Sequence, residues 1–118
     1  MTDLAKRRCE PCNAETPPIE GKELERFRDH LHPRWRVVED HHLAATFTFE
    51  DFASALDFTN RMGEVAESEG HHPEICLTWG RVKVRLWTHA IDGLSENDFI
   101  LAAKIDGIAG AGPGAQTP

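Results

Sequence analysis

Charged and apolar residues alternate strictly along the segment from residue 81 to residue 86. The apolar positions are Val82, Val84 and Leu86, and the charged positions are Arg81, Lys83 and Arg85. Because successive side chains of a strand point to opposite faces, this pattern predicts a strand with one buried face and one exposed face. Such a strand fits an antiparallel sheet that packs against other elements on one side only.

Four strands are predicted in all, arranged as two hairpins. Their residues are 35–39 with 43–49, and 74–79 with 81–88. Gly80 provides the turn of the second hairpin, and residues 40–42 form a connection short enough for the first. We therefore interpret His41 and His42 as solvent-exposed loop residues.

Three other segments carry the helical period. They are residues 20–31, residues 51–69 and the stretch that begins at Ser95. The first ends before Pro33, because a residue that precedes proline is pushed out of helical geometry. In the third, Ser95 followed by Asp98 resembles a capping box. The apolar stripe of the second helix is predicted to contain Phe52, Ala55, Leu56, Thr59, Met62, Gly63 and Ala66.

The order of these elements is α-β-β-α-β-β-α. It predicts an α+β fold in which three helices pack on one face of a four-stranded antiparallel sheet. With 118 residues, the chain has room for one hydrophobic core. We assign residues 19–109 to this domain, residues 1–18 to an irregular N-terminal arm, and residues 110–118 to a disordered tail.

The composition disfavours several classes of partner. A net charge of −7 opposes binding to nucleic-acid phosphates. No apolar run is long enough to cross a bilayer, and the basic residues 6–8 lack the apolar stretch that follows them in a secretory signal. We therefore expect a cytoplasmic protein with no membrane or nucleic-acid partner.

Three cysteines give no disulfide framework, because their number is odd. Cys9 and Cys12 form a single Cys-x-x-Cys pair, and Cys76 lies in a predicted strand. A structural zinc usually takes four ligands, and a second cysteine pair is missing. We interpret Cys9 and Cys12 as a reduced pair in the arm, with zinc binding and redox use as the alternatives.

The candidate functional residues are three histidines near the open end of the second hairpin. His71 and His72 precede its first strand, and His89 follows its second strand. Because the strands are antiparallel and turn at Gly80, these ends come together. Glu67 lies one helical turn before His71, close enough to orient an imidazole.

Three interpretations of this cluster remain open from the pattern alone. Histidine titrates near neutral pH, so the cluster could hold both a general acid and a general base. It could also be a hydrogen-bonded polar cluster without chemistry, or a metal site, although adjacent histidines are an awkward chelate for one ion. Gly70 permits a bend and Pro73 keeps His72 extended. Trp79 and Trp87 could enclose a flat ligand or belong to the core.

The same residues resemble the signature of the pterin-4a-carbinolamine dehydratases, also called 4a-hydroxytetrahydrobiopterin dehydratases. That pattern is an acidic or polar residue, three further positions, His-His-Pro, an aromatic residue, Thr-His and an aspartate. It is filled here by Glu67, His71, His72, Pro73, Trp79, Thr88, His89 and Asp98. The resemblance covers residues 20–109, and Cys9-Glu10-Pro11-Cys12 resembles the arm of bacterial members encoded alongside phenylalanine hydroxylase.

The resemblance implies a hydro-lyase without a metal or cofactor. Its substrate would be the 4a-hydroxytetrahydropterin left by an aromatic amino acid hydroxylase, and its product would be quinonoid dihydropterin, which returns to pterin recycling. It implies proton exchange by His71 and His89, an assisting role for His72 and an orienting role for Glu67. The substrate-binding residues that it implies are Gly70, His71, His72, Trp87, Thr88, His89 and Ala90.

Family members also form homo-oligomers, either dimers or tetramers, which suits the exposed strand edges expected here. Some relatives of this fold act as dimerisation cofactors or assembly scaffolds without catalysis. Such members tend to lack the histidine set, which is complete here. A non-catalytic scaffold is therefore the alternative to the enzyme.

Overall fold

The computed structural model describes residues 4–10, 16–111 and 115–116 of the chain. Its sheet has the strand order β1-β2-β4-β3, and every pairing is antiparallel. The strands are β1 (Arg36–Val38), β2 (His42–Phe49), β3 (Glu74–Thr78) and β4 (Arg81–Leu86). A short strand, β5 (Ala115–Gln116), pairs with the end of β2.

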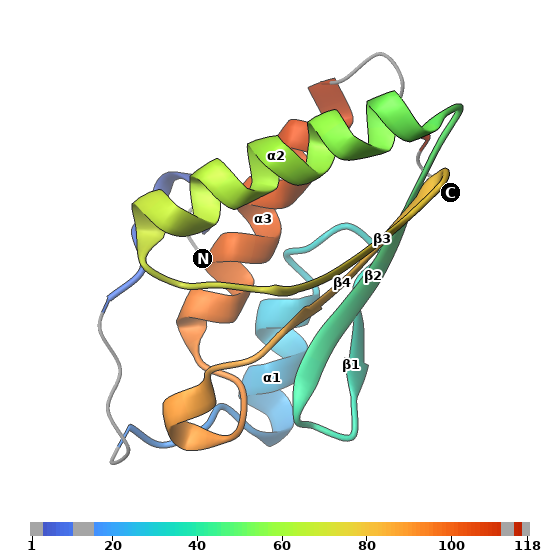
Figure 1. Ribbon diagram of the computed structural model, residues 1–118. Coiled ribbons are helices and arrows are strands. Elements are labelled where there is room, and N and C mark those ends of the chain that lie inside the picture. Colours follow the sequence, from blue (N-terminus) through green and yellow to red (C-terminus); the bar gives the residue numbers. More distant parts are fainter. Residues whose placement is uncertain (1–3, 11–15, 112–114, 117–118) are drawn as a thin grey trace.

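Three helices lie on one face of this sheet (Figure 1). They are α1 (Gly21–Arg28), α2 (Phe52–Glu69) and α3 (Glu96–Ala111). The predicted order α-β-β-α-β-β-α and the α+β class are therefore confirmed. Two 3-10 turns, η1 (Leu4–Lys6) and η2 (His89–Ile91), add to it. Among the described residues, no helix is long and apolar enough to cross a membrane.

The core forms where the apolar faces of the sheet and helices meet. On β4, Val82, Val84 and Leu86 are fully buried, whereas the alternate residues are exposed, as the alternation predicts. Phe99 and Ile105 of α3 are also fully buried. Burial of these side chains is the main favourable contribution to folding.

The buried stripe of α2 differs from the predicted one. Phe52 and Leu56 are 45% and 39% exposed, and Phe58, which the prediction left out, is buried. Phe58 packs on the rings of Phe47 and Phe49, with ring centroids 4.8 and 5.1 Å away. This contact turns the helix so that the stripe runs through residues 55, 58, 62 and 66, which carries Leu56 to the outside.

The interpretation of His41 and His42 as exposed loop residues was wrong for His42. His42 is the first residue of β2, pairs with Val38 and is 9% exposed. Glu39 and Asp40 adopt left-handed backbone conformations, with φ of 53° and 54°. This tight turn starts the strand one residue earlier than predicted.

The two chain ends lie partly outside the described residues. Within the predicted irregular arm, Leu4 is 3% exposed and belongs to the core cluster. Within the predicted disordered tail, Gly110 and Ala111 end α3, and Ala115–Gln116 forms β5. The predictions for residues 1–3, 11–15, 112–114 and 117–118 concern positions that the structure does not describe.

Candidate active site

A cavity of about 730 Å³ opens between the end of α2 and the end of β4. The residues that line it come from the N-terminal segment, the end of α2 and the start of β3 with their connection, the segment from the end of β4 into η2, and α3. They are Cys9, Glu10, Glu69, Gly70, His71, His72, Pro73, Glu74, Trp87, Thr88, His89, Ala90 and Asn97. The hairpin therefore brings the three predicted histidines to one cavity, as expected.

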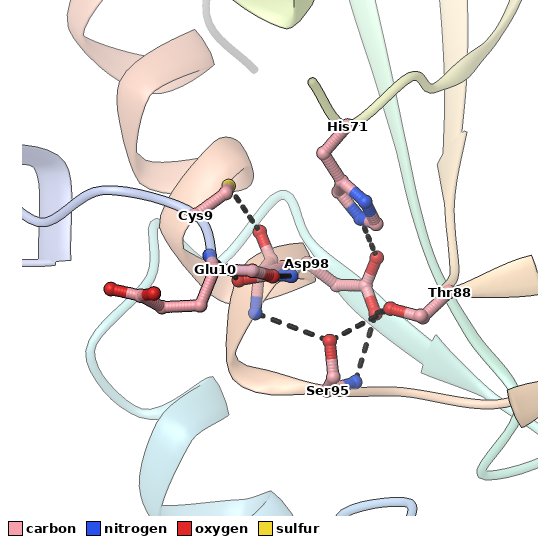
Figure 2. Close-up of polar contacts among 7 residues, drawn as sticks. Cys9, Glu10, His71, Thr88, Ser95 and Asp98 are labelled. Atoms are coloured by element: carbon pink, nitrogen blue, oxygen red, sulfur yellow. Dashed lines mark hydrogen bonds and ion pairs between the residues drawn. The ribbon is translucent and has the colours of Figure 1, made fainter. Parts of the chain in front are cut away.

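His71 is held against Asp98 at the wall of this cavity (Figure 2). Gly70 ends α2 in the left-handed conformation, with φ of 66°, and this turn directs the chain toward β3. The Nε2 atom of His71 lies 2.6 Å from Oδ1 of Asp98. The Asp98 side chain is fully buried, and that of His71 is 12% exposed.

The second oxygen of Asp98 is also occupied. It accepts hydrogen bonds from the Thr88 hydroxyl and from the Ser95 N–H, both at 2.9 Å. The Thr88 and Ser95 hydroxyl oxygens lie 2.7 Å apart. Asp98 reaches back to Ser95 N–H, so one half of the predicted capping box forms. Three groups thus hold the Asp98 carboxylate in one geometry: the His71 imidazole, the Thr88 hydroxyl and the Ser95 N–H.

His72 points away from this network and pairs with Glu67 instead. The Nε2 atom of His72 lies 2.8 Å from Oε1 of Glu67, and both side chains are well exposed. Adjacent residues on an extended segment face opposite sides, which separates His71 from His72. The expectation that Glu67 orients His71 is therefore replaced by a Glu67–His72 pair.

His89 lies flat on the indole ring of Trp87. The two ring centroids are 4.5 Å apart and the planes differ by 11°. Arg85 lies over the same indole at 5.2 Å, and the ring of His42 has its centroid 6.0 Å away. The stack holds the imidazole of His89 at the cavity mouth, where the side chain is exposed.

Most of the predicted site residues meet at this cavity, but two do not. All seven predicted substrate-binding residues line it, although the Thr88 hydroxyl is used by Asp98 and Ser95. Glu67 is not among the lining residues, and Trp79 is 68% exposed at the far turn of the hairpin. Trp79 therefore neither encloses this cavity nor belongs to the core of the chain.

Five lining residues were not predicted from the sequence: Cys9, Glu10, Glu69, Glu74 and Asn97. Burial, assisted by the neighbouring Glu69 carboxylate, raises the pKa of Cys9 to about 12. The hydrogen bond that the Cys9 N–H donates lowers the pKa of the Glu69 carboxyl. No sequence signal links residue 9 to residue 97, because their contact depends on packing.

Among the described residues, no group of three or more His, Cys, Asp or Glu side chains is arranged to hold a metal ion.

Residues 17–108 match the family described as Pterin 4 alpha carbinolamine dehydratase. The chain belongs to this dehydratase family. The match covers strands β1 to β4, the three helices up to residue 108 and the three histidines of the cavity. The family takes its name from a hydro-lyase reaction, so the resemblance noted in the sequence is confirmed at the level of the family and its enzyme class.

Close relatives of this dehydratase family member span nearly its whole length. A protein from Alkaliphilus metalliredigens is 51% identical over 106 residues, which cover 90% of this chain and 96% of the relative. One from Rubrobacter xylanophilus is 52% identical over 106 residues, covering 90% and 98%. Both carry the name "Putative pterin-4-alpha-carbinolamine dehydratase".

Two solved structures share the dehydratase fold. A transcriptional coactivator/pterin dehydratase from Brucella melitensis superimposes with a TM-score of 0.73 at 30% identity, covering 78% of this chain and 98% of that one. A pterin dehydratase-like protein, identified as a RuBisCO assembly factor in the alpha-carboxysome, gives 0.59 at 26% identity, covering 69% and 95%.

Proposed function

We propose that this chain dehydrates 4a-hydroxytetrahydropterin to quinonoid dihydropterin by histidine acid/base catalysis. The observation that carries the proposal is the 2.6 Å contact between His71 and buried Asp98 at the wall of a cavity that also exposes His89. A carboxylate behind an imidazole is a recurrent way to prepare a histidine for proton transfer.

The reaction requires two proton transfers. A base removes the proton from ring nitrogen 5, and the electron pair of that N–H bond forms the double bond between nitrogen 5 and carbon 4a. An acid protonates the 4a hydroxyl, which leaves as water. One neutral imidazole and one imidazolium supply this chemistry, and neither a metal nor a cofactor is needed.

We assign the base to His71 and the acid to His89. Asp98 already receives hydrogen bonds at its other oxygen, so it acts as an acceptor toward His71 as well. The proton of His71 then resides on Nε2, which leaves Nδ1 as the nitrogen that accepts a proton. His89 lies across the same cavity on Trp87 and has the exposure needed to exchange its proton with water.

The remaining cavity residues bind the flat pterin ring in this proposal. Gly70, Trp87 and Ala90 line the walls, and His72, paired with Glu67, assists at the mouth. Thr88 contributes through its backbone, because Asp98 and Ser95 use its hydroxyl. We further propose a cytoplasmic homo-oligomer that serves an aromatic amino acid hydroxylase by returning its pterin to recycling.

The test is the dehydration rate of freshly generated 4a-hydroxytetrahydropterin, followed by ultraviolet absorbance. Wild type should accelerate it, and His71→Ala and His89→Ala should each lower kcat on the order of 10²-fold or more. The matched control is His30→Ala, since His30 is an exposed histidine that follows α1 and does not line the cavity. Full activity in the double variant His71→Ala/His89→Ala would refute the assignment.

A non-catalytic scaffold is the second candidate, favoured by the likeness to the RuBisCO assembly factor. The complete histidine set and the His71–Asp98 contact argue for the enzyme, because helix capping explains the contact of Asp98 with Ser95 but not an imidazole held at the wall of a cavity. A folded wild type that leaves the dehydration rate unchanged, yet forms a stoichiometric complex that survives His71→Ala, would favour the scaffold.

A further inference from the structure

The N-terminal segment of residues 4–10, here called the N-terminal arm, is anchored to the domain at its start. Leu4 is buried in the core cluster and η1 packs on α3. The Lys104 ammonium donates a hydrogen bond to the Ala5 carbonyl at 2.7 Å and lies 3.7 Å from the Glu69 carboxylate. One lysine of α3 thus ties the arm to the end of α2.

The last residues of the N-terminal arm are held by two cavity residues. The Cys9 N–H donates to Oε1 of Glu69 at 2.8 Å. The Glu10 N–H donates to Oδ1 of Asn97 at 2.9 Å, and Nδ2 of Asn97 donates to the Glu10 carbonyl at 2.5 Å. Asn97 is 6% exposed. The oxygen and the nitrogen of the Asn97 side-chain amide therefore both form hydrogen bonds with the arm backbone.

The hydrogen bonds that hold Cys9 and Glu10 lie beside His71 and Asp98. Asn97 directly precedes Asp98 in the first turn of α3, and Glu69 lies two residues before His71. Figure 2 shows Cys9 and Glu10 on the side of Asp98 that lies away from Thr88. Cys9, Glu10, Glu69 and Asn97 line the same cavity as the histidines. The family match begins at residue 17, so Cys9 and Glu10 lie outside the matched region, whereas Glu69 and Asn97 lie within it.

We propose that the N-terminal arm is a wall of the substrate site, and that Asn97 is the positioning residue that holds it against the pterin. The inference rests on the proposed function. A flat ligand buries most of its surface only when walls stand on both sides of it, and Trp87–Ala90 supply the other wall. The Cys9 thiol, with its raised pKa of about 12, is a neutral contact and not a nucleophile.

Such a wall has a kinetic signature that differs from that of the histidines. It contacts the ring equally in the ground state and in the transition state, while the proton-transfer groups stay in place. Loss of the wall therefore raises KM and leaves kcat nearly unchanged. A residue with only a structural role would instead lower the melting temperature without this separation.

The experiment uses the full chain with Asn97→Leu, which fills a similar volume and makes no hydrogen bonds. We expect KM to rise about tenfold with kcat within about twofold, and trypsin to cleave faster after Arg7 and Arg8. Asn97→Ala is the second variant, because alanine is a strong helix former and leaves no buried polar group unpaired at this position. It removes both side-chain hydrogen bonds to the Glu10 backbone, so its KM should rise by a similar factor.

The matched control is Asn60→Leu, the same change of side chain at an exposed position of α2. Asn60 does not line the cavity, so its KM should stay within about twofold of wild type. An unchanged KM in both Asn97 variants would overturn the proposal, as would an equal rise in Asn60→Leu.

Direct binding of 7,8-dihydrobiopterin, which undergoes no dehydration, separates this inference from the proposed function. If wild type binds it but does not accelerate dehydration, the proposed reaction fails while weaker binding by Asn97→Leu still supports the wall. If wild type accelerates dehydration and Asn97→Leu binds dihydrobiopterin as tightly as wild type, the reaction stands and the wall is refuted.

Discussion

The Nε2 atom of His71 lies 2.6 Å from Oδ1 of Asp98, although 27 positions separate the two residues in the chain. Asp98 is fully buried and its second oxygen is bound by Thr88 and Ser95. The carboxylate is therefore fixed in orientation, and its contact with Nε2 fixes the orientation of the His71 imidazole. In the proposed mechanism Asp98 is a positioning residue, so its replacement should lower kcat.

Asp98→Asn should lower kcat on the order of 10²-fold or more. The amide keeps one oxygen, which accepts the hydrogen bonds of the Thr88 hydroxyl and the Ser95 N–H. Its NH₂ group then faces His71 and forces the proton from Nε2 to Nδ1, which removes the base. The measurement is the ultraviolet dehydration assay. Asp57→Asn, on the exposed surface of α2, is the control, and a kcat of Asp98→Asn within threefold of wild type would contradict the assignment.

Asp106→Ala should destabilise the fold by about 3–5 kcal/mol, because it leaves a buried guanidinium without its partner. The Arg34 side chain is 3% exposed, lies 3.3 Å from Asp106 and covers the Phe47 ring at 4.8 Å. Burial lowers the pKa of Arg34 and raises the pKa of Asp106, so each charge needs the other. Urea unfolding gives the free energy.

The control for Asp106→Ala is Asp57→Ala, which breaks an exposed pair with Arg61 and should cost less than about 0.5 kcal/mol. Equal losses in the two variants would show that burial of the Arg34 pair has no energetic consequence.

Wild type should lose stability as the pH falls below about 6.5, and His42→Gln should lose less. Burial lowers the pKa of His42 below its usual value, and the charges of Arg85 and His41 add to this effect. The unfolded chain therefore binds the proton first. The stabilising contribution is complete above the unfolded pKa and is lost as pH falls through the folded one.

Urea midpoints between pH 7.5 and 5 measure this difference, since the other six histidines are common to both proteins. Parallel pH profiles for wild type and His42→Gln would show that His42 is protonated as easily in the folded state as in the unfolded one.

Cys9 should react about 10²-fold more slowly with iodoacetamide at pH 8 in the folded protein than in urea. Its pKa of about 12 lowers the thiolate fraction roughly 10³-fold, and the greater nucleophilicity of a more basic thiolate offsets part of this. Tandem mass spectrometry, which distinguishes Cys9 from Cys12 within one tryptic peptide, follows the reaction. Equal rates in the two conditions would mean that the arm does not bury this thiol.

Periodicity predicted the elements whose own residues carry the signal. The alternation of β4 and the helical stripe of α2 arise from local geometry, so their type and order followed from the chain alone. Periodicity did not predict the burial of residues whose exposure is set by tertiary contacts or by a turn. Leu56 is exposed because Phe58 packs on two rings of the sheet, and His42 is buried because a left-handed turn starts β2 early.

The sequence by itself determined the family, the order of the elements and the meeting of His71, His72 and His89 at the open end of a hairpin. Only the tertiary structure decided which carboxylate serves which histidine, and that the N-terminal arm lines the cavity. Spacing along the chain indicates which side chains lie near one another. Packing sets the direction of each side chain and therefore its partner, and residues 9 and 97 meet only after the helices have packed.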